Sequence, residues 1–403
     1  MKSRLNLLSG GAGLLLASLC VSGVAAPIAS HWAFTDLGDL PGGTDFSRAY
    51  AINNTGQVVG VSSTDSGQRA FLWQQGQGMT DLGDLPGGPA NSVGLGISST
   101  GQVVGNSDTA AGQRAFVWQN GAMSEVPFMP GTDVSATAIN DSGQILLHRN
   151  FDSSASEAFL WDGGATTSLG DLVRSQQYPF CPCFSRAYAL NNLGDVVGVS
   201  SPPGTLGATN HAFLWHQGTM IDLGASHYSS PNRYESIAFD INDRGQAVGW
   251  EQPGDGASEA RAVIWTDQGR TATALIGLPG TTASAARAIN AHDQVVGSNS
   301  VGGNVVPVLW SDGRAYDLNA LEGVRDGLFE ILAAWDINDA GQIVGLAQLR
   351  GTSTTHAFFL SPDETRTVQE AGSMALSATV VGAALLGSVR CKRKRVQVER
   401  RCW

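Results

Sequence analysis

Short apolar runs alternate with turn-forming residues between residues 34 and 360, and three phrases recur there in a fixed order. The first phrase, AINNTGQVVG at 51–60, returns in related form at 96–105, 138–147, 189–198, 240–249, 288–297 and 336–345. The second phrase, RAFLW at 69–73, returns at 114–118, 157–161, 211–215, 261–265, 306–310 and 356–360. The third phrase, MTDLGDL at 79–85, returns at 122–128, 166–172 and 220–226, and it also opens the region as FTDLGDL at 34–40. The middle of the chain is therefore seven copies of one unit.

Each unit predicts four short β-strands. The apolar runs are rich in Val, Ile, Phe and Trp, and Gly, Asn and Asp bound them. The Asn-x-x-Gly-Gln stretch inside the first phrase is typical of a hairpin turn with Gly in the left-handed region. Four strands in a unit of about 47 residues are typical of one propeller blade.

We therefore predict an all-β, seven-bladed β-propeller over residues 32–361. Small residues precede the first phrase, as in SRAYAIN at 47–53, and suit an innermost strand near the axis. The chain opens with the third phrase alone and its last unit ends on the second phrase. Strand 34–40 should therefore pair with strand 356–360 and close the ring. An open solenoid is the alternative, but it would leave sheet edges exposed.

The phrases resemble the HAF family of bacterial extracellular repeats. The family pattern runs His-Ala-Phe-Leu-Trp, Asp-Leu-Gly-x-Leu-Gly-Gly, Ala-x-x-Ile-Asn and Gly-Gln-Val-Val-Gly, which is similar to RAFLW, MTDLGDLPGG and AINNTGQVVG here. The resemblance covers about 34–360. It implies an exported bacterial protein and a propeller fold, and it implies no defined activity and no catalytic residues.

The N-terminal residues 1–26 read as a secretory signal peptide. Lys2 and Arg4 precede a short apolar core, and Val24-Ala25-Ala26 offers small residues for cleavage. An uncleaved N-terminal helix is the alternative, and Leu19 ahead of Cys20 argues against lipidation.

The C-terminus has the layout of a membrane anchor or sorting signal. A linker at 362–373 leads to an uncharged, mostly apolar segment at 374–389, and a basic tail at 390–403 follows. The apolar segment is near the lower length limit for a spanning helix, and the basic cluster would stay in the cytoplasm. The layout resembles the PEP-CTERM type of sorting signal, although Ser361-Pro362-Asp363-Glu364 replaces Pro-Glu-Pro. We expect membrane contact through 374–395, and an amphipathic or disordered tail is the alternative.

The exported body is acidic, and this excludes nucleic acid as a partner. Residues 27–389 contain 34 acidic residues, 15 Arg and no Lys. Such a body lacks the positively charged surface that nucleic-acid binding needs. Nothing in the composition calls for an oligomer, and we expect a monomer.

Two sets of residues recur in register, and we interpret both as structural. One Trp per unit is typical of packing between neighbouring sheets, and the Asn of the first phrase is typical of a side chain that bonds its own turn. The Trp set is Trp73, Trp118, Trp161, Trp215, Trp265 and Trp310. The Asn set is Asn53, Asn140, Asn191, Asn242, Asn290 and Asn338, with Ser98 in the second unit.

Ligands of propellers usually lie over the axis, on the face formed by loops that enter the inner strands. In those loops the candidate ligand-binding residues are Arg48, Arg186, Tyr228 and Arg233, because Arg and Tyr can bind a carboxylate or a glycan. Solvated loop residues are the alternative interpretation. His211 and His356 share one strand-start position, where we expect edge or rim residues.

The sequence offers no metal, cofactor or catalytic motif. Asp240-x-Asn242 begins like a calcium loop, but Arg244 stands at the fifth position where an oxygen ligand is needed. Cys181-Pro182-Cys183 can be two thiols, a strained disulfide or an intermolecular bridge. No His-Glu-x-x-His, Gly-x-Ser-x-Gly or phosphate loop occurs in the exported body.

These observations favour an exported, non-enzymatic binding or surface-structural module at the bacterial cell envelope, anchored by its C-terminal segment or released after processing. A glycan or a surface protein would be its partner. The alternative is a hydrolase or lyase that acts on extracellular polysaccharide, an idea that rests on fold analogy alone.

Overall fold

The computed structural model describes residue 29 and residues 31–128, 133–150, 156–172, 184–201, 210–224, 235–252 and 259–363. The predicted signal peptide, apolar segment and basic tail, and the two cysteines at 181 and 183, lie outside these residues. Within the described ranges, no helix is long and apolar enough to cross a membrane.

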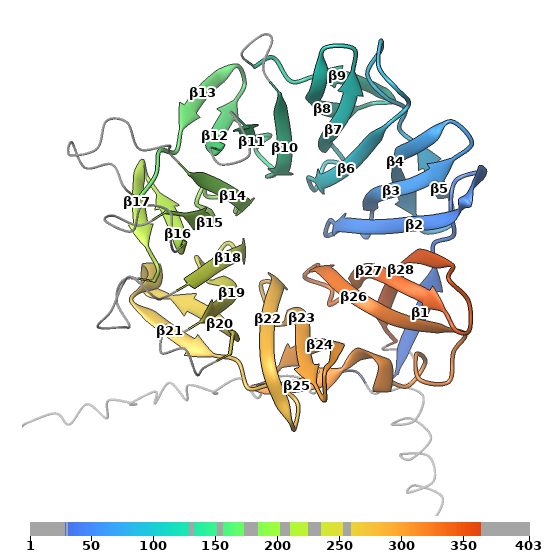
Figure 1. The fold of residues 1–403 in the computed structure, drawn as a ribbon, viewed down its shortest axis with the longest axis vertical. Coiled ribbons are helices and arrows are strands. Elements are labelled where there is room, and N and C mark those ends of the chain that lie inside the picture. The colour runs from blue at the N-terminus through green and yellow to red at the C-terminus, as the bar shows by residue number, and fades with distance from the viewer. Residues whose placement is uncertain are drawn as a thin grey trace, which may run out of the picture.

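Seven four-stranded antiparallel blades are arranged around a common axis, as the sequence predicts (Figure 1). A parallel bridge between Phe46 and Thr355 joins two of them into one eight-stranded sheet. The innermost strands are β2 (Gly42–Ile52), β6 (Ser92–Ile97), β10 (Val134–Ile139), β14 (Ser185–Leu190), β18 (Glu235–Ile241), β22 (Thr281–Ile289) and β26 (Phe329–Ile337). The second strands are β3 (Val58–Thr64), β7 (Val103–Thr109), β11 (Ile145–Asn150), β15 (Val196–Ser200), β19 (Ala247–Gln252), β23 (Val295–Val301) and β27 (Ile343–Leu349).

The third strands carry the HAFLW-like phrase. They are β4 (Gly67–Gln74), β8 (Gly112–Gln119), β12 (Ser156–Asp162), β16 (His211–His216), β20 (Arg261–Thr266), β24 (Asn304–Ser311) and β28 (Thr355–Pro362). The outermost strands are β5 (Gly78–Asp81), β9 (Ala122–Glu125), β13 (Ala165–Ser168), β17 (Thr219–Asp222), β21 (Thr271–Ala274), β25 (Arg314–Asp317) and β1 (Trp32–Asp36). Two short 3-10 helices complete the described elements: η2 (Asp267–Gly269) lies between β20 and β21, and η3 (Leu318–Ala320) follows β25. We number the blades 1 to 7 from β2 to β28.

The N-terminal strand completes the last blade, as predicted. Strand β1 pairs antiparallel with β28, from Trp32 opposite Pro362 to Asp36 opposite Phe358. It ends at Asp36, four residues before the predicted end, because Gly38 adopts a positive φ of 67° and its N–H bonds the Asp36 carboxylate. The leucines of the same phrase, Leu37 and Leu40, then turn inward and are buried.

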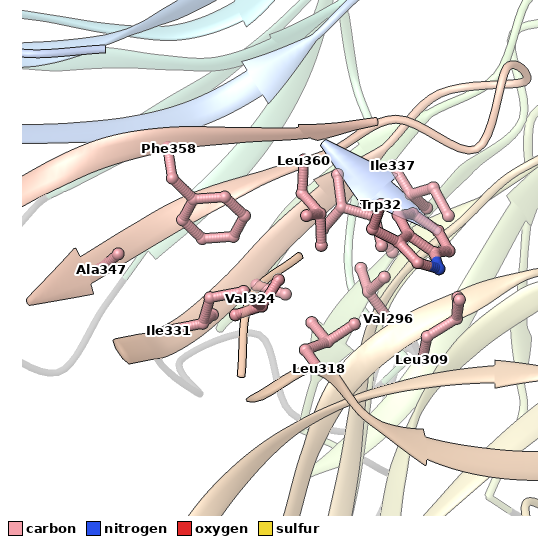
Figure 2. Close-up of a cluster of buried hydrophobic side chains, with 13 residues drawn as sticks. Trp32, Val296, Leu309, Leu318, Val324, Ile331, Ile337, Ala347, Phe358 and Leu360 are labelled. Atoms are coloured by element: carbon pink, nitrogen blue, oxygen red, sulfur yellow. The ribbon is translucent and has the colours of Figure 1, made fainter. Parts of the chain in front are cut away.

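The core lies between neighbouring blades. Figure 2 shows the cluster between blades 6 and 7, where Trp32 packs beside Val296, Leu309 and Ile337. The recurring Trp side chains lie in equivalent inter-blade clusters, and the Trp73 ring lies 5.4 Å from that of Phe359 on the preceding blade.

Two glycines show why the first phrase is so constant. Gly56 takes a φ of 77° in the hairpin turn, a conformation that other residues rarely adopt. Gly60 lies so close to the inner strand that a Cβ atom there would meet the carbonyl oxygen of Arg48 at 1.9 Å. Gly is therefore favoured at both places for different reasons. Blade 6 has Asp293 at the first place, with a φ of 62°, and blade 3 has Leu147 at the second.

Candidate functional site

The recurring Asn residues join the blades around the axis. In blade 1, Asn53 Oδ1 accepts bonds from the N–H groups of Thr55 and Gln57 in its own turn, at 3.1 and 3.0 Å. Its Nδ2 donates to the carbonyl oxygen of Ser98 on blade 2, at 2.9 Å. The same inter-blade bond runs from Asn140 to Asn191, from Asn191 to Asn242, from Asn242 to Asn290, from Asn290 to Asn338 and from Asn338 to Asn53, at 3.0–3.2 Å.

These turns surround a hollow of about 200 Å³ at one end of the axis, lined by residues from all seven blades. The polar side chains at its mouth are largely satisfied by one another. Asn192 Nδ2 bonds the carboxylates of Asp141 and Asp243, and Asn54 Nδ2 bonds that of Asp339. This end of the axis therefore holds the ring together.

A β-bulge in each innermost strand sets the direction of a side chain further along the axis. In every blade the pairing of the innermost and second strands shifts at the residue three positions before the recurring Asn or Ser. A bulge re-aims the side chain at that point. The bulged residues are Tyr50, Leu95, Thr137, Tyr188, Phe239, Arg287 and Trp335. Five of the seven are therefore aromatic or cationic.

Arg48 lies among three of the aromatic rings around the axis. Its guanidinium carbon is 5.1 Å from the Trp335 ring centre, 5.6 Å from that of Phe46 and 5.9 Å from that of Tyr50. Tyr50 and Trp335 stack on each other with centroids 5.4 Å apart. Arg48 Nη1 donates to the Tyr50 hydroxyl at 3.2 Å, while its Nε is buried without a hydrogen-bond partner.

A second cationic and aromatic group lies on blades 4 to 6. The Arg287 guanidinium carbon is 4.2 Å from the Phe239 ring centre, and Tyr188 lies 5.2 Å from the same ring. Arg186 is exposed on β14, two residues before Tyr188. Burial and, next, the charge of Arg186 lower the pKa of His148 to about 4, so a neutral imidazole stands beside that guanidinium.

The arginines of the innermost strands differ from those further out. Arg69, Arg114, Arg149 and Arg261 on second and third strands each pair with a carboxylate, at 2.6–3.4 Å. Within the described part of the chain, no carboxylate pairs with Arg48, Arg186 or Arg287. An acidic protein thus keeps three uncompensated cations around its axis.

A polar groove at the seam between blades 7 and 1 is lined in part by Phe46, whose ring centre lies 5.6 Å from the Arg48 guanidinium carbon. It has a volume of about 490 Å³ and includes Phe46. Its other lining residues are Thr44, Asp45, Ser63, Thr64, Gly67, Gln68, Ser353 and Thr355. Hydroxyl and amide groups beside an aromatic ring and a guanidinium suit a sugar that carries a carboxylate.

Sequence reasoning found part of this arrangement. Arg48 and Arg186 were candidates and lie on innermost strands, whereas Tyr228 and Arg233 fall outside the described residues. Trp335 and Phe239 were not predicted as binding residues. The position that they share, three residues before the constant Asn, varies from unit to unit, and that variation could have marked it as a candidate binding position. The expected rim position of His211 is not observed, because its side chain is buried and its Nδ1 lies 2.9 Å from the Asp222 carboxylate.

Two acidic residues in the ring accept hydrogen bonds from backbone N–H groups. Asp240 accepts the N–H groups of Ile241 and Ile289, and Asp336 accepts those of Ile337 and Ile52, all at 2.8 Å. Each therefore bridges two blades. Burial raises the pKa of Asp240 to about 6. Burial, and next the charge of Asp240, raise the pKa of Asp336 to about 8. In the described ranges, no group of His, Cys, Asp and Glu side chains is arranged to hold a metal.

Known proteins match this chain in fold. No family model and no curated protein matches its sequence. An oligogalacturonate lyase from Vibrio parahaemolyticus is 10% identical with a TM-score of 0.50, over 82% of this chain and 94% of that one. The structure described as YCF48 bound to D1 peptide is 13% identical with a TM-score of 0.47, over 82% and 96%. TolB from Acinetobacter baumannii is 11% identical with a TM-score of 0.38, over 76% and 79%. At 10% identity the match to the lyase structure shows a β-propeller fold alone.

Proposed function

We propose that this protein is an exported β-propeller that binds an acidic oligosaccharide at its axis without transforming it. The observation that carries the proposal is the Arg48 group, in which an unpaired guanidinium lies among Phe46, Tyr50 and Trp335. A hexuronate sugar offers a carboxylate for the guanidinium and an apolar face for an aromatic ring. The acidic outer surface would repel such a ligand everywhere else, which favours binding at the axis.

Isothermal titration calorimetry of the full chain tests the ligand class. The probes are a hexuronate tetrasaccharide and the same tetrasaccharide with its carboxyl groups reduced to alcohols. We expect the acidic probe to bind at least roughly tenfold more tightly, and its affinity to fall as salt is added, because each charged hydrogen bond is stronger than a neutral one. Equal affinity for the two probes, or no heat with either, would contradict the proposal.

We propose further that the units are HAF-type repeats and that the chain is held at the cell envelope by 374–395. The HAF resemblance and the apolar segment with its basic flank support this. Intact mass and cell fractionation test it. We expect a mass that lacks residues 1–26 and keeps 374–403, in the membrane fraction. A mass that ends before Met374, in the medium, would make the C-terminal segment a cleaved sorting signal.

A further inference from the structure

Blade 4 departs from the other blades at two positions that lie together in space. The fourth residue after the recurring Asn or Ser is Asp195 in blade 4, and it is Gln in the six other blades. Those glutamines are Gln57, Gln102, Gln144, Gln246, Gln294 and Gln342. The residue that ends β16 is His216, where the corresponding residues are Gln74, Gln119, Asp162, Thr266, Ser311 and Ser361.

The two substituted residues form an acid–imidazole pair in which the carboxylate is buried and the imidazole is partly exposed. Asp195 is only 7% exposed. Its Oδ2 accepts a bond from Asn191 Nδ2 at 3.2 Å, and its Oδ1 lies 2.6 Å from Nδ1 of His216. An ionised carboxylate only accepts, so Nδ1 of the imidazole carries the proton and Nε2 of the neutral ring carries a lone pair. The pair therefore has the order of groups that orients a general base.

His216 lines a hollow of about 500 Å³ between blades 4 and 5. Arg244, at its edge, is paired with Asp293. Arg270 also lines the hollow, and no carboxylate in the described residues pairs with it. Leu193, which is 73% exposed, and Leu214 supply an apolar wall. A base, a residue that orients it, a cation and an apolar wall thus share one hollow, which Asp243 and Asp267 also line.

We propose that this hollow is a hydrolytic site for a neutral carboxylic ester, separate from the axial site. Nε2 of His216 takes a proton from a water molecule while the water oxygen forms a bond to the ester carbonyl carbon. Arg270 stabilises the negative charge that develops on the carbonyl oxygen. The bond from that carbon to the alcohol oxygen then breaks, and His216 returns the proton to the leaving alkoxide, so that an acid and an alcohol are released. Asp195 is a positioning residue.

Two substitutions that restore the residues of other blades test the proposal with little risk to the fold. Asp195→Gln keeps an acceptor for Asn191, as Gln144 does for Asn140, and His216→Gln copies blades 1 and 2. The assay is hydrolysis of p-nitrophenyl acetate by the full chain. We expect each substitution to lower kcat/KM by roughly a hundredfold or more. His292→Gln, at an exposed histidine outside the hollow, is the control and should leave kcat/KM unchanged. Hydrolysis by H216Q within about twofold of the wild-type rate would overturn the proposal.

The role of Asp195 has a readout that does not depend on turnover. Nitrogen NMR of histidine-labelled protein reports which imidazole nitrogen carries the proton. We expect the neutral His216 ring of the wild type to be protonated on Nδ1, and D195Q to shift the proton toward Nε2 while kcat falls more than KM changes. The same tautomer in both proteins would show that Asp195 does not orient the imidazole.

Discussion

Asn338 Nδ2 donates a hydrogen bond to the carbonyl oxygen of Asn53 at 3.0 Å, across 285 positions of sequence. This bond crosses the seam between blades 7 and 1, where the first and last parts of the propeller meet. Asp339 and Asn54 add a reciprocal pair at the same seam, with the Asp339 N–H bonded to Asn54 Oδ1 and Asn54 Nδ2 bonded to Asp339 Oδ2. The recurring Asn, whose side chain bonds its own turn in each blade, therefore also closes the ring.

Substitutions at Asn338 should separate these two roles. Asn338→Ala removes the inter-blade bond and both turn bonds from a buried site, and we expect a loss of about 2–3 kcal/mol in the free energy of unfolding. Asn338→Ser should lose about half as much, because Ser98 shows that Ser still bonds its turn, through Oγ to the Gln102 N–H. Urea unfolding measures both. A free energy of unfolding for Asn338→Ser equal to that of the wild type would contradict a separate inter-blade contribution.

Blade 2 allows the reverse experiment. Ser98 lacks an Nδ2 group, so the circle of inter-blade bonds has a gap between blades 2 and 3. Ser98→Asn should add a bond to the carbonyl oxygen of Asn140 and stabilise the protein by about 1 kcal/mol. A raised urea midpoint with an unchanged slope is the expected result. A lower midpoint would mean that blade 2 cannot accommodate the turn of the other blades.

Acid should stabilise the ring through Asp240 and Asp336. Their folded-state pKa values, about 6 and about 8, lie above the ordinary value of 3.8. The folded chain therefore holds these protons more tightly, and the resulting stabilisation is complete below pH 3.8 and is lost as the pH rises through about 6 and about 8. We expect the urea midpoint to fall between about pH 4 and about pH 8 and to level off above that.

Asp336→Ala provides the matched variant, because Ala occupies this position in blades 1, 3, 4 and 6. The decline of the urea midpoint with pH should be clearly shallower in D336A than in the wild type. Asp312→Asn, at an exposed turn, should keep the wild-type slope. If the urea midpoint of D336A falls with pH as steeply as that of the wild type, groups other than Asp336 cause the pH dependence.

Trp32 anchors the N-terminal strand in the last blade. Its side chain is 4% exposed and packs among the residues between blades 6 and 7 (Figure 2). Trp32→Ala should cost about 3–5 kcal/mol, the usual cost of emptying such a site. Ala33→Ser, at the exposed neighbour on the same strand, should change the free energy of unfolding by less than about 0.5 kcal/mol. Thermal unfolding of the two variants decides whether β1 is needed for the stability of the ring.

The periodic features of the chain were predictable, and the contacts between units were not. The first and second phrases each occur seven times, and a third phrase stands alone at 34–40. These observations were enough to predict seven blades and the pairing of β1 with β28. The bond from Asn338 to Asn53 depends on how two units meet in space, so no pattern within one unit contains it. The axial group around Arg48 forms because a β-bulge sets the direction of the Tyr50 and Trp335 side chains. No particular residue type marks a bulge, so the sequence did not predict it. Asp195 is different, since its departure from Gln is visible once the units are aligned.

The central claim is that the axis binds an acidic ligand through Arg48 and its aromatic neighbours. The most direct test is calorimetric titration of a hexuronate tetrasaccharide into the wild type, Arg48→Gln, Trp335→Ala and the control Arg325→Gln. Arg325 is exposed and pairs with the adjacent Asp326, whereas no carboxylate in the described residues pairs with Arg48. We predict that R48Q and W335A each weaken binding by roughly tenfold or more, while R325Q binds like the wild type. Wild-type affinity in R48Q and W335A would place the ligand elsewhere and contradict the claim.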